Sequence, residues 1–386
     1  MDKRVYLLTI VAFIVGMVEL IIGGILDLVA TDLNVSLGKA GLLITIFSLV
    51  FAVSAPILLV VTAKVERKKL SLLSLFIFFI GNIIAIFSPS FSVLMIARII
   101  SAASGSLLIV LCITIASSIV PQKHVGRAIG IVVMGISGSL VFGVPIGLML
   151  GNSFGWRAPF ILITGLTLLL IIGIYYFMEK IAPQPSIPLK QQLATLKNSK
   201  ILFAHITMFL FLAGHMVLYA YFTPFLKTIL GLDATWVSIV YLVFGVAAIT
   251  GGGLGGTLAD RFGAKPVILT VITVFAIAMF SIPVATFSLT IFLIIMIIWG
   301  MMNWAITPAL QSYLIESAPE TAAIQQSLNN SALHFGIAFG SLVGGVVIER
   351  TSVEYNATVG GLFIILALGA ALFSMTRKTN SNINER

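Results

Sequence analysis

A single carboxylate, Glu19, interrupts an apolar stretch at residues 5–26 that is long enough to cross a bilayer. An acid inside the hydrocarbon of a membrane is costly unless it is protonated or paired, so it usually marks a path for protons or a polar solute. Arg98 lies inside a second apolar stretch, 92–118, at a depth compatible with that of Glu19. The arginine charge favours the ionised carboxylate and burial favours the protonated one, which is the balance that a proton-coupling carboxylate needs. The alternative is a static ion pair that only fixes helix packing.

Two histidines stand in other apolar stretches. His215, in 201–225, follows Glu19 by 196 residues. Imidazole titrates near neutrality, so we predict that His215 contributes to proton coupling. His334, in 323–348, is embedded in a polar stripe with Asn329 and Asn330. Both histidines are equally compatible with a packing role in which a backbone carbonyl or a neighbouring helix satisfies the ring.

Apolar stretches recur along the whole chain, with 59% hydrophobic and only 9% charged residues in 386 positions. This composition is typical of polytopic membrane proteins and argues against a soluble domain. Because backbone polar groups in lipid must be satisfied within the segment, each stretch is predicted to be a helix. The predicted fold is all-α with twelve membrane-spanning helices, at 5–26, 39–63, 69–88, 92–118, 126–150, 157–178, 201–225, 235–258, 265–286, 289–313, 323–348 and 355–376.

Lysine and arginine are distributed unequally between the loops. An even number of spans puts both termini on one side, and a cytoplasmic N-terminus puts most of the 22 Lys and Arg residues on the cytoplasmic side. That distribution agrees with the positive-inside rule for a multi-pass protein of the cell membrane. The formal charge of +9 then faces anionic lipid of the bilayer, and no nucleic-acid partner is expected.

The longest hydrophilic stretch, 179–200, contains Pro183, Pro185 and Pro188. It predicts a cytoplasmic linker between an N-terminal six-helix half, 1–178, and a C-terminal six-helix half, 201–386. The loops after the second span of each half are similar to one another at an offset of 197 residues, close to half of the chain. This repeat indicates an internal duplication.

The sequence GTLADRFGAK at 256–265 resembles the loop signature of the major facilitator superfamily, between the second and third helices of each half. The resemblance implies two pseudo-symmetric halves, a solute site between them near the membrane midplane, and alternating access. It also implies that Asp260, Arg261 and Lys265 form a latch that changes as the halves move. The first copy departs from the pattern, because Ala63 replaces the acid and Glu66 replaces a glycine. A latch in that half must use other partners.

Two further patterns, LMIAR at 94–98 and GSLVFGVPIG at 138–147, resemble the drug:H+ antiporter branch of that superfamily. The chain is also similar to the purine-base and nucleoside efflux permeases of Bacillus type, most clearly in GMVELIIGGIL, TAKVERKKL, AGHMVLYAYFTPFL and QQSLNNSAL. This resemblance, and not the composition, implies a purine base or nucleoside as the exported solute.

A purine is flat, neutral and polar at its edges, so its site needs aromatic faces for stacking and amides for hydrogen bonds. Trp299 and Asn303 are four residues apart and share a helical face. The predicted substrate site consists of Tyr219, Trp299, Asn303, Gln326, Asn329, Asn330 and His334. Helix packing is the alternative role for members of this set.

Chemical motifs of enzymes do not occur in this sequence. There is no Walker loop, paired-histidine metal site or nucleophile elbow, so we expect no enzyme activity, cofactor or metal. The glycine-rich run at 251–256 lies within a predicted membrane helix and is better explained by close helix packing. The sequence therefore predicts a monomeric, proton-coupled exporter. A multidrug, chloramphenicol-like or sugar antiporter shares this framework, and a channel is the alternative from another class.

Overall fold

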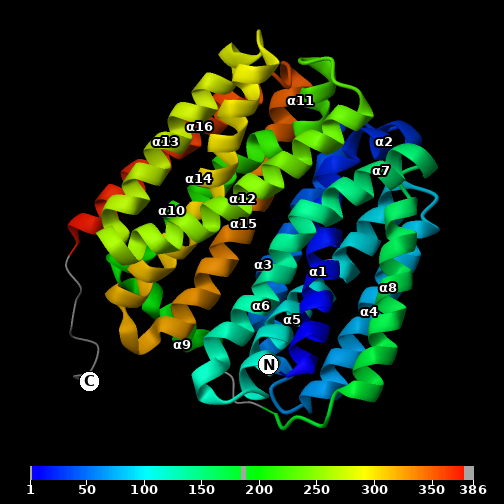
Figure 1. The fold of residues 1–386 in the computed structure, drawn as a ribbon, viewed down its shortest axis with the longest axis vertical. Coiled ribbons are helices and arrows are strands. Elements are labelled where there is room, and N and C mark those ends of the chain that lie inside the picture. Colours follow the sequence, from blue (N-terminus) through cyan, green and yellow to red (C-terminus); the bar gives the residue numbers. More distant parts are fainter. Residues whose placement is uncertain (1, 184–187, 378–386) are drawn as a thin grey trace. The chain divides into compact units, whose positions relative to one another are not determined.

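The computed structural model describes residues 2–183 and 188–377, and helices dominate these residues (Figure 1). Within them, twelve helical segments are long and apolar enough to cross a membrane. The predicted all-α fold with twelve spans is therefore confirmed, and the predicted ends lie within a few residues of the observed ones. Pro185 of the predicted linker lies outside the described residues.

The main spanning helices begin and end close to polar or turn-forming residues. The side chains of Ser36 and Ser90 accept hydrogen bonds from the third N–H of the helix that follows each, at 3.1 and 3.5 Å, and so fix two starts. The helices are α1 Lys3–Gly24, α3 Leu37–Val61, α4 Arg67–Ile86, α5 Phe91–Ser118, α8 Ala158–Phe177, α10 Ser199–Tyr219, α12 Ala234–Phe262, α13 Ala264–Ala285, α14 Leu289–Ser317, α15 Ala322–Arg350 and α16 Tyr355–Thr376.

Three predicted spans are interrupted where the sequence indicated one continuous helix. The first ends at Gly24 and resumes as α2, Leu26–Asp32, and the seventh breaks before α11, Phe222–Thr228. The fifth consists of α6 Val125–Gly138, a π-helical turn at Ser139–Gly143 and α7 Val144–Phe154. Pro145 has no N–H to donate to the preceding turn, which explains why the helix widens just before it.

The element order repeats along the chain. The starts of α1, α2, α3, α4, α5, α6 and α8 are followed 196–198 residues later by the starts of α10, α11, α12, α13, α14, α15 and α16. Even the break after α1 has its counterpart after α10, because α2 and α11 are each seven residues long. The duplication inferred from one loop therefore extends over all of these helices.

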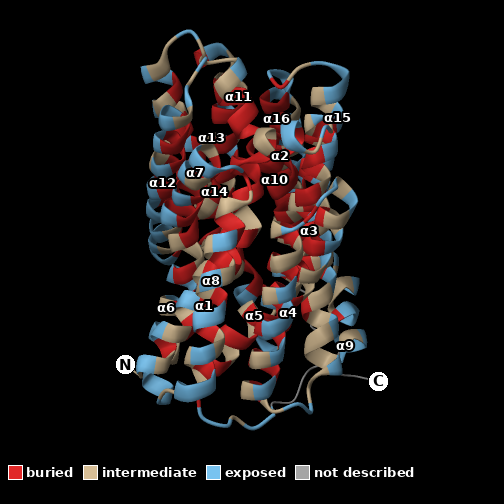
Figure 2. Ribbon diagram, turned by 90° about the vertical axis from the view of Figure 1, so that its right-hand side faces the viewer, coloured by how far each residue is buried: buried red, intermediate tan, exposed pale blue. Residues whose placement is uncertain are grey.

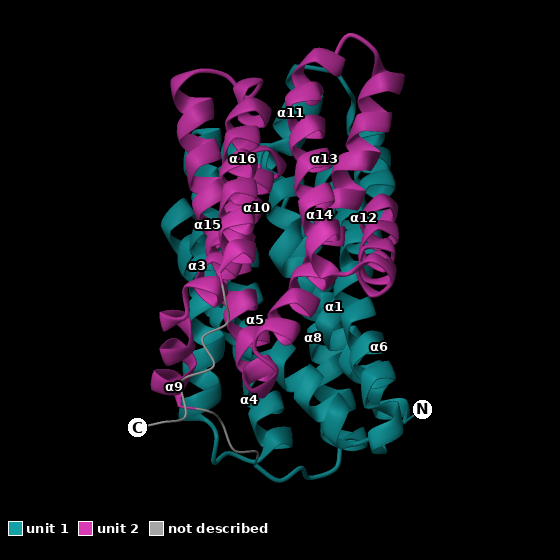
Figure 3. Cartoon of the chain, turned by 90° about the vertical axis from the view of Figure 1, so that its left-hand side faces the viewer, with its two compact units in different colours: residues 1–186, 221–245 teal, residues 187–220, 246–386 magenta. Residues whose placement is uncertain are grey.

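Two compact units divide the chain, and they are coloured separately in Figure 3. Unit 1 consists of Met1–Ser186 with Tyr221–Gly245, and unit 2 of Ile187–Ala220 with Val246–Arg386. The segment Tyr221–Gly245, which holds α11 and the first part of α12, thus groups with the N-terminal residues. The sequence-based division at 178 and 201 stays a prediction.

The first helix of each repeat is deeply buried in its own unit. In the most apolar window of each span, 61% of the residues are buried in α1 and 72% in Ser199–Thr228, which contains α10 and α11. Buried residues are red in Figure 2. In unit 1, α1 contacts α3, α5, α6 and α8; in unit 2, α10 contacts α14, α15 and α16. The helices that carry Glu19 and His215 are therefore packed elements of the two units.

Candidate functional site

Glu19 and Arg98 lie together in unit 1. Arg98 is only 1% exposed, whereas Glu19 is partly exposed, and their opposite charges attract one another. The guanidinium donates to the backbone oxygens of Val18, at 2.7 Å, and Leu43, at 3.4 Å. It also lies over the ring of Phe47, with its central carbon 4.0 Å from the ring centroid. Arg98 thus fixes a positive charge beside Glu19 and ties together α1, α3 and α5.

The Nη2 atom of Arg98 is buried and makes no hydrogen bond to the described residues. An unmet donor on a buried cation is costly. Ionised Glu19 stabilises the buried guanidinium of Arg98 more than protonated Glu19 does. A change in the protonation of Glu19 therefore changes the electrostatic energy of Arg98.

The π-helical turn packs directly against the helix that carries Glu19. A Cβ atom at Gly16 would collide with Ser139, and one at Gly147 would collide with Ile21. The Ser139 hydroxyl donates to the carbonyl of Ile136 at 2.6 Å. Small residues thus bring the fifth span close to α1 at positions before and after Glu19 in the sequence. A movement of the fifth span would therefore change the environment of Glu19.

His215 belongs to an aromatic cluster in unit 2. Its ring stacks on that of Tyr219, with ring centroids 4.9 Å apart and ring planes at 26°. The centroid of the His215 ring also lies 5.2 Å from that of Trp299 and 6.1 Å from that of Phe275. Tyr219 and Trp299 also meet edge to face at 6.1 Å. The structure therefore brings together two predicted substrate residues and one predicted proton-coupling residue. Trp299 is 0% exposed, so its ring is covered in this conformation.

The predicted polar residues of α14 and α15 fall on different faces. Asn303, Asn329 and His334 are buried, at 8%, 1% and 5% exposure. Gln326 and Asn330 are exposed. Their spacing predicted one polar surface, but the adjacent amides Gln325 and Asn329 point into the unit instead.

A buried contact that sequence reasoning missed explains this orientation. His205 of α10 lies 3.0 Å, through Nε2, from the Oε1 atom of Gln325, whose amide nitrogen donates to Thr321. Gln325 is fully buried, and Asn329 also interacts with the ring of His205. The sequence feature that could have indicated this contact is His205 itself, a histidine near the start of the seventh span and ten residues before His215.

A second missed cluster joins the short helices after the two breaks, both in unit 1. Lys227 of α11 forms an ion pair with Asp27 of α2 at 2.6 Å. The Thr223 hydroxyl donates to the carbonyl of Gly24 at 3.0 Å and lies 3.1 Å from the hydroxyl of Tyr241. These contacts attach Tyr221–Gly245 to the N-terminal residues.

The residues of the predicted latch do not pair in this conformation. Asp260, Arg261 and Lys265 are all exposed, and the salt bridges of the described chain do not include them. Their latch role stays a prediction. The glycine-rich run before them packs closely against α14, because Cβ atoms at Gly251 and Gly255 would collide with the backbone of Met301 and Ala305. The packing explanation of that run is confirmed.

Glu66, which replaces the signature glycine in the first copy, has a clear structural task. Its carboxylate accepts from the backbone N–H groups of Lys68 and Lys69, at 2.8 and 3.0 Å, and so caps α4. It also accepts from Ile181 at 2.8 Å, which holds the start of the predicted linker against unit 1. Burial opposes ionisation of Glu66, but these hydrogen bonds outweigh it and keep its pKa below the usual value.

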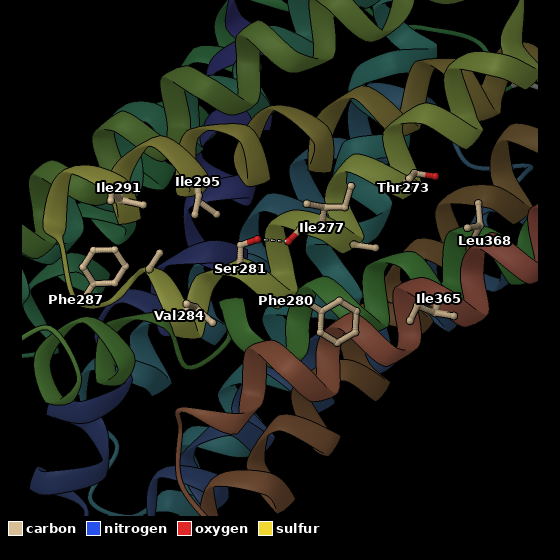
Figure 4. Close-up of a pocket in the computed structure, with 12 residues that line it drawn as sticks. Thr273, Ile277, Phe280, Ser281, Val284, Phe287, Ile291, Ile295, Ile365 and Leu368 are labelled. Atoms are coloured by element: carbon tan, nitrogen blue, oxygen red, sulfur yellow. Dashed lines mark hydrogen bonds between the residues drawn. The ribbon is translucent and has the colours of Figure 1, made fainter.

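A groove outside the predicted site offers little polar chemistry. A groove of about 600 Å³ between α13, α14 and α16 is lined almost entirely by apolar side chains (Figure 4). Its hydroxyls, from Ser281 and Thr273, donate to the carbonyls of Ile277 and Leu269. Within residues 2–183 and 188–377, no three His, Cys, Asp or Glu side chains are placed to hold a metal ion.

Asp32 anchors three loops of unit 1, and its contribution to stability is expected to depend on pH. Its Oδ2 atom accepts from Trp156 at 2.8 Å and from Arg157 at 2.7 Å, and Arg157 also donates to the carbonyl of Ser88. The hydrogen bonds from Trp156 and Arg157 keep the pKa of Asp32 below its usual value. The stabilisation is therefore present above the unfolded-state pKa of about 3.9 and is lost as the pH falls through the lower folded-state pKa.

We expect Asp32→Asn to lower the melting temperature by about 1–2 °C at pH 7, because Asp32 is half exposed and its ion pair is screened by solvent. The difference from the unmutated protein should shrink below about pH 4. Thermal unfolding in detergent between pH 3 and 7 measures it. Glu354→Gln is the control, since Glu354 is exposed and makes no side-chain cap. A pH-independent difference would contradict the role of the Asp32 charge.

Duplicated spanning helices define a polytopic helical membrane protein, and two of its spans hold an acid, Glu19, and a buried arginine, Arg98, whose charges attract one another. The profile of the Major Facilitator Superfamily matches residues 8–341. The chain belongs to this superfamily and is a multi-pass membrane transporter.

Relatives match this chain along nearly their whole length. The uncharacterized MFS-type transporter YbcL of Bacillus subtilis (strain 168) is 35% identical over 99% of both chains. The "Probable sugar efflux transporter" of Helicobacter pylori (strain P12) is 25% identical over 95% of this chain and 93% of its own. The crystal structure of a D-xylose-proton symporter superposes with a TM-score of 0.78 over 97% of both chains, at 17% identity, which shows the shared fold.

Proposed function

We propose that the protein exports a small organic solute in exchange for protons by alternating access. The observation that carries the proposal is the pairing of Glu19 with buried Arg98 inside membrane-spanning helices. Glu19 takes up a proton from outside, and the proton is released toward the cytoplasm as the carrier changes conformation. His215 is the corresponding position of the second repeat and contributes to the same coupling.

The coupling scheme needs a carboxylate that is accessible in one conformation and balanced between two charge states. Glu19 is partly exposed while Arg98 is held rigidly by two carbonyls and a ring. A fixed cation beside a titrating acid lets protonation change the local charge without moving a long side chain. These features favour the proton-coupling role over a purely structural ion pair, because in a structural ion pair both side chains would be fixed.

A purine base or nucleoside is the proposed solute. The aromatic cluster of His215, Tyr219 and Trp299 offers ring faces, and Asn303 has a buried carbonyl oxygen without a hydrogen-bond partner in the described residues. A planar heterocycle with N–H groups at its edge would satisfy that oxygen. Because Trp299 is covered in this conformation, binding requires the cluster to open.

Asn303→Ala is expected to weaken adenine or hypoxanthine binding by about 1–3 kcal/mol, because a buried amide that bonds the solute is lost. Gln326→Ala should do the same if its exposed amide reaches the solute. Counterflow in proteoliposomes with radiolabelled purines, drugs and sugars measures both the affinity and the substrate class. Asn82→Ala, which removes a fully buried amide of α4, is the control for loss of packing alone.

A sugar exporter is the second candidate, because a relative of similar length carries the name of a sugar efflux transporter. Cells that express the protein should tolerate toxic purine analogues better than vector controls if the purine proposal holds, with little protection against ethidium. Counterflow of a sugar with no counterflow of purines would favour the second candidate. Strong ethidium protection alone would favour a multidrug exporter.

A further inference from the structure

The outer surface of α4 and α8 in unit 1 combines a long apolar stripe with a basic and aromatic end. The two helices pack side by side, and both are membrane spans. Leu73 and Phe76 of α4 are each 54% exposed, and Leu169 and Ile172 of α8 are 64% and 47% exposed. Residues at spacings of three and four lie on one helical face, so each helix contributes one continuous stripe.

The same faces end in lysines and aromatic rings. Lys69 precedes Leu73 by one turn and is exposed, and Lys68 lies beside it at the start of α4. The last turn of α8 carries Tyr175, Tyr176 and Phe177, which are 60%, 74% and 72% exposed. The ammonium of Lys68 lies 5.7 Å from the centroid of the Tyr175 ring, and the two tyrosine rings meet edge to face at 5.1 Å. The basic groups and the rings therefore form one connected patch.

The charge of Glu66 attracts that of Lys69, but Glu66 forms no salt bridge with either lysine of this patch. Both oxygens of Glu66 are occupied by backbone N–H groups of Lys68, Lys69 and Ile181. The salt bridges of residues 2–183 and 188–377 do not involve the ammonium of Lys68 or of Lys69. Two cations thus remain available at the end of an exposed apolar stripe.

We propose that this surface is a binding site for an anionic phospholipid of the surrounding bilayer. The phosphate lies between Lys68 and Lys69, Tyr175 and Tyr176 flank the headgroup, and the acyl chains cover the stripes of α4 and α8. Exposed tyrosines at the end of a span are typical of the headgroup level of a membrane. Cations at that level attract anionic lipid, whereas the apolar stripe distinguishes a lipid from free phosphate.

The test is native mass spectrometry of the purified transporter with phosphatidylglycerol and, separately, phosphatidylcholine. The unmutated protein should bind phosphatidylglycerol more tightly, and K68Q/K69Q should weaken that binding about tenfold while leaving phosphatidylcholine unchanged. K123Q/R127Q is the matched control, because it removes two exposed charges, one just before α6 and one in its first turn. Its phosphatidylglycerol affinity should change less than about twofold.

Four outcomes would overturn the proposal. Equal affinity for the two lipids would remove the charge argument, and unchanged binding by K68Q/K69Q would place the lipid elsewhere. An equal loss of phosphatidylglycerol affinity in K123Q/R127Q would indicate that the lipid is attracted by the overall positive charge and not by a site at Lys68 and Lys69. F76S provides the apolar test: it should weaken both lipids, and unchanged binding of both would exclude the α4 stripe. Thermal unfolding of each variant verifies that it is folded.

Discussion

Glu19→Gln is expected to abolish uphill, pH-driven transport while equilibrium exchange of the solute continues. The amide has the shape of the acid but cannot take up or release a proton, so solute movement is no longer linked to the proton gradient. Exchange across equal concentrations needs only binding and the conformational change, and it should stay within about tenfold of the unmutated rate.

Proteoliposomes separate these two activities. Uphill transport is measured after an imposed pH gradient, and exchange is measured at equal pH with labelled solute on one side. Glu354→Gln is the control, because it makes the same acid-to-amide change at an exposed position outside the membrane spans. Gradient-driven accumulation by Glu19→Gln at the unmutated rate would exclude Glu19 as the coupling residue. Currents far above carrier turnover would indicate a channel instead.

The pairing of Glu19 with Arg98 could be predicted because both are rare residues in otherwise apolar spans. Charges at such depths must be compensated, and each had only one candidate partner at a similar level. The spans themselves followed from hydropathy and from the need to satisfy the backbone in lipid. These inferences depend on average composition over long windows, and an error of a few residues in the ends of a span does not change that average much.

Contacts between distant residues could not be predicted in this way. Asp27 marked only the end of the first span in the sequence, and Lys227 only an exterior charge, although they form an ion pair 200 residues apart. In the run from Gln325 to Asn330, spacing shows which amides share a face but not which face is buried. That choice depends on His205, on another helix. Glu66 appeared as a departure from a motif, and its role required the position of Ile181.

The charge reversals Asp27→Lys and Lys227→Asp are each expected to reduce transport at least about tenfold, and the double reversal is expected to restore most of it. The ion pair joins α2 and α11, the short helices that directly follow α1 and α10. Both side chains are about three-quarters buried, so two like charges at 2.6 Å would be poorly screened. The segment Tyr221–Gly245 would then lose one of its anchors to the N-terminal residues.

In the alternating-access cycle that we propose, this ion pair opens and forms again, so a permanent repulsion should affect the rate more than solute binding. Transport rate and solute affinity are measured together, with thermal unfolding to verify the fold. The coupling energy between the two reversals should be about 1 kcal/mol or more, since the pair is only partly exposed. Thr223→Val, which removes the hydrogen bond to Gly24 and keeps the charges, is the control for local packing. Single reversals with normal transport, or a double reversal as slow as either single one, would show that the ion pair is structural and does not take part in the transport cycle.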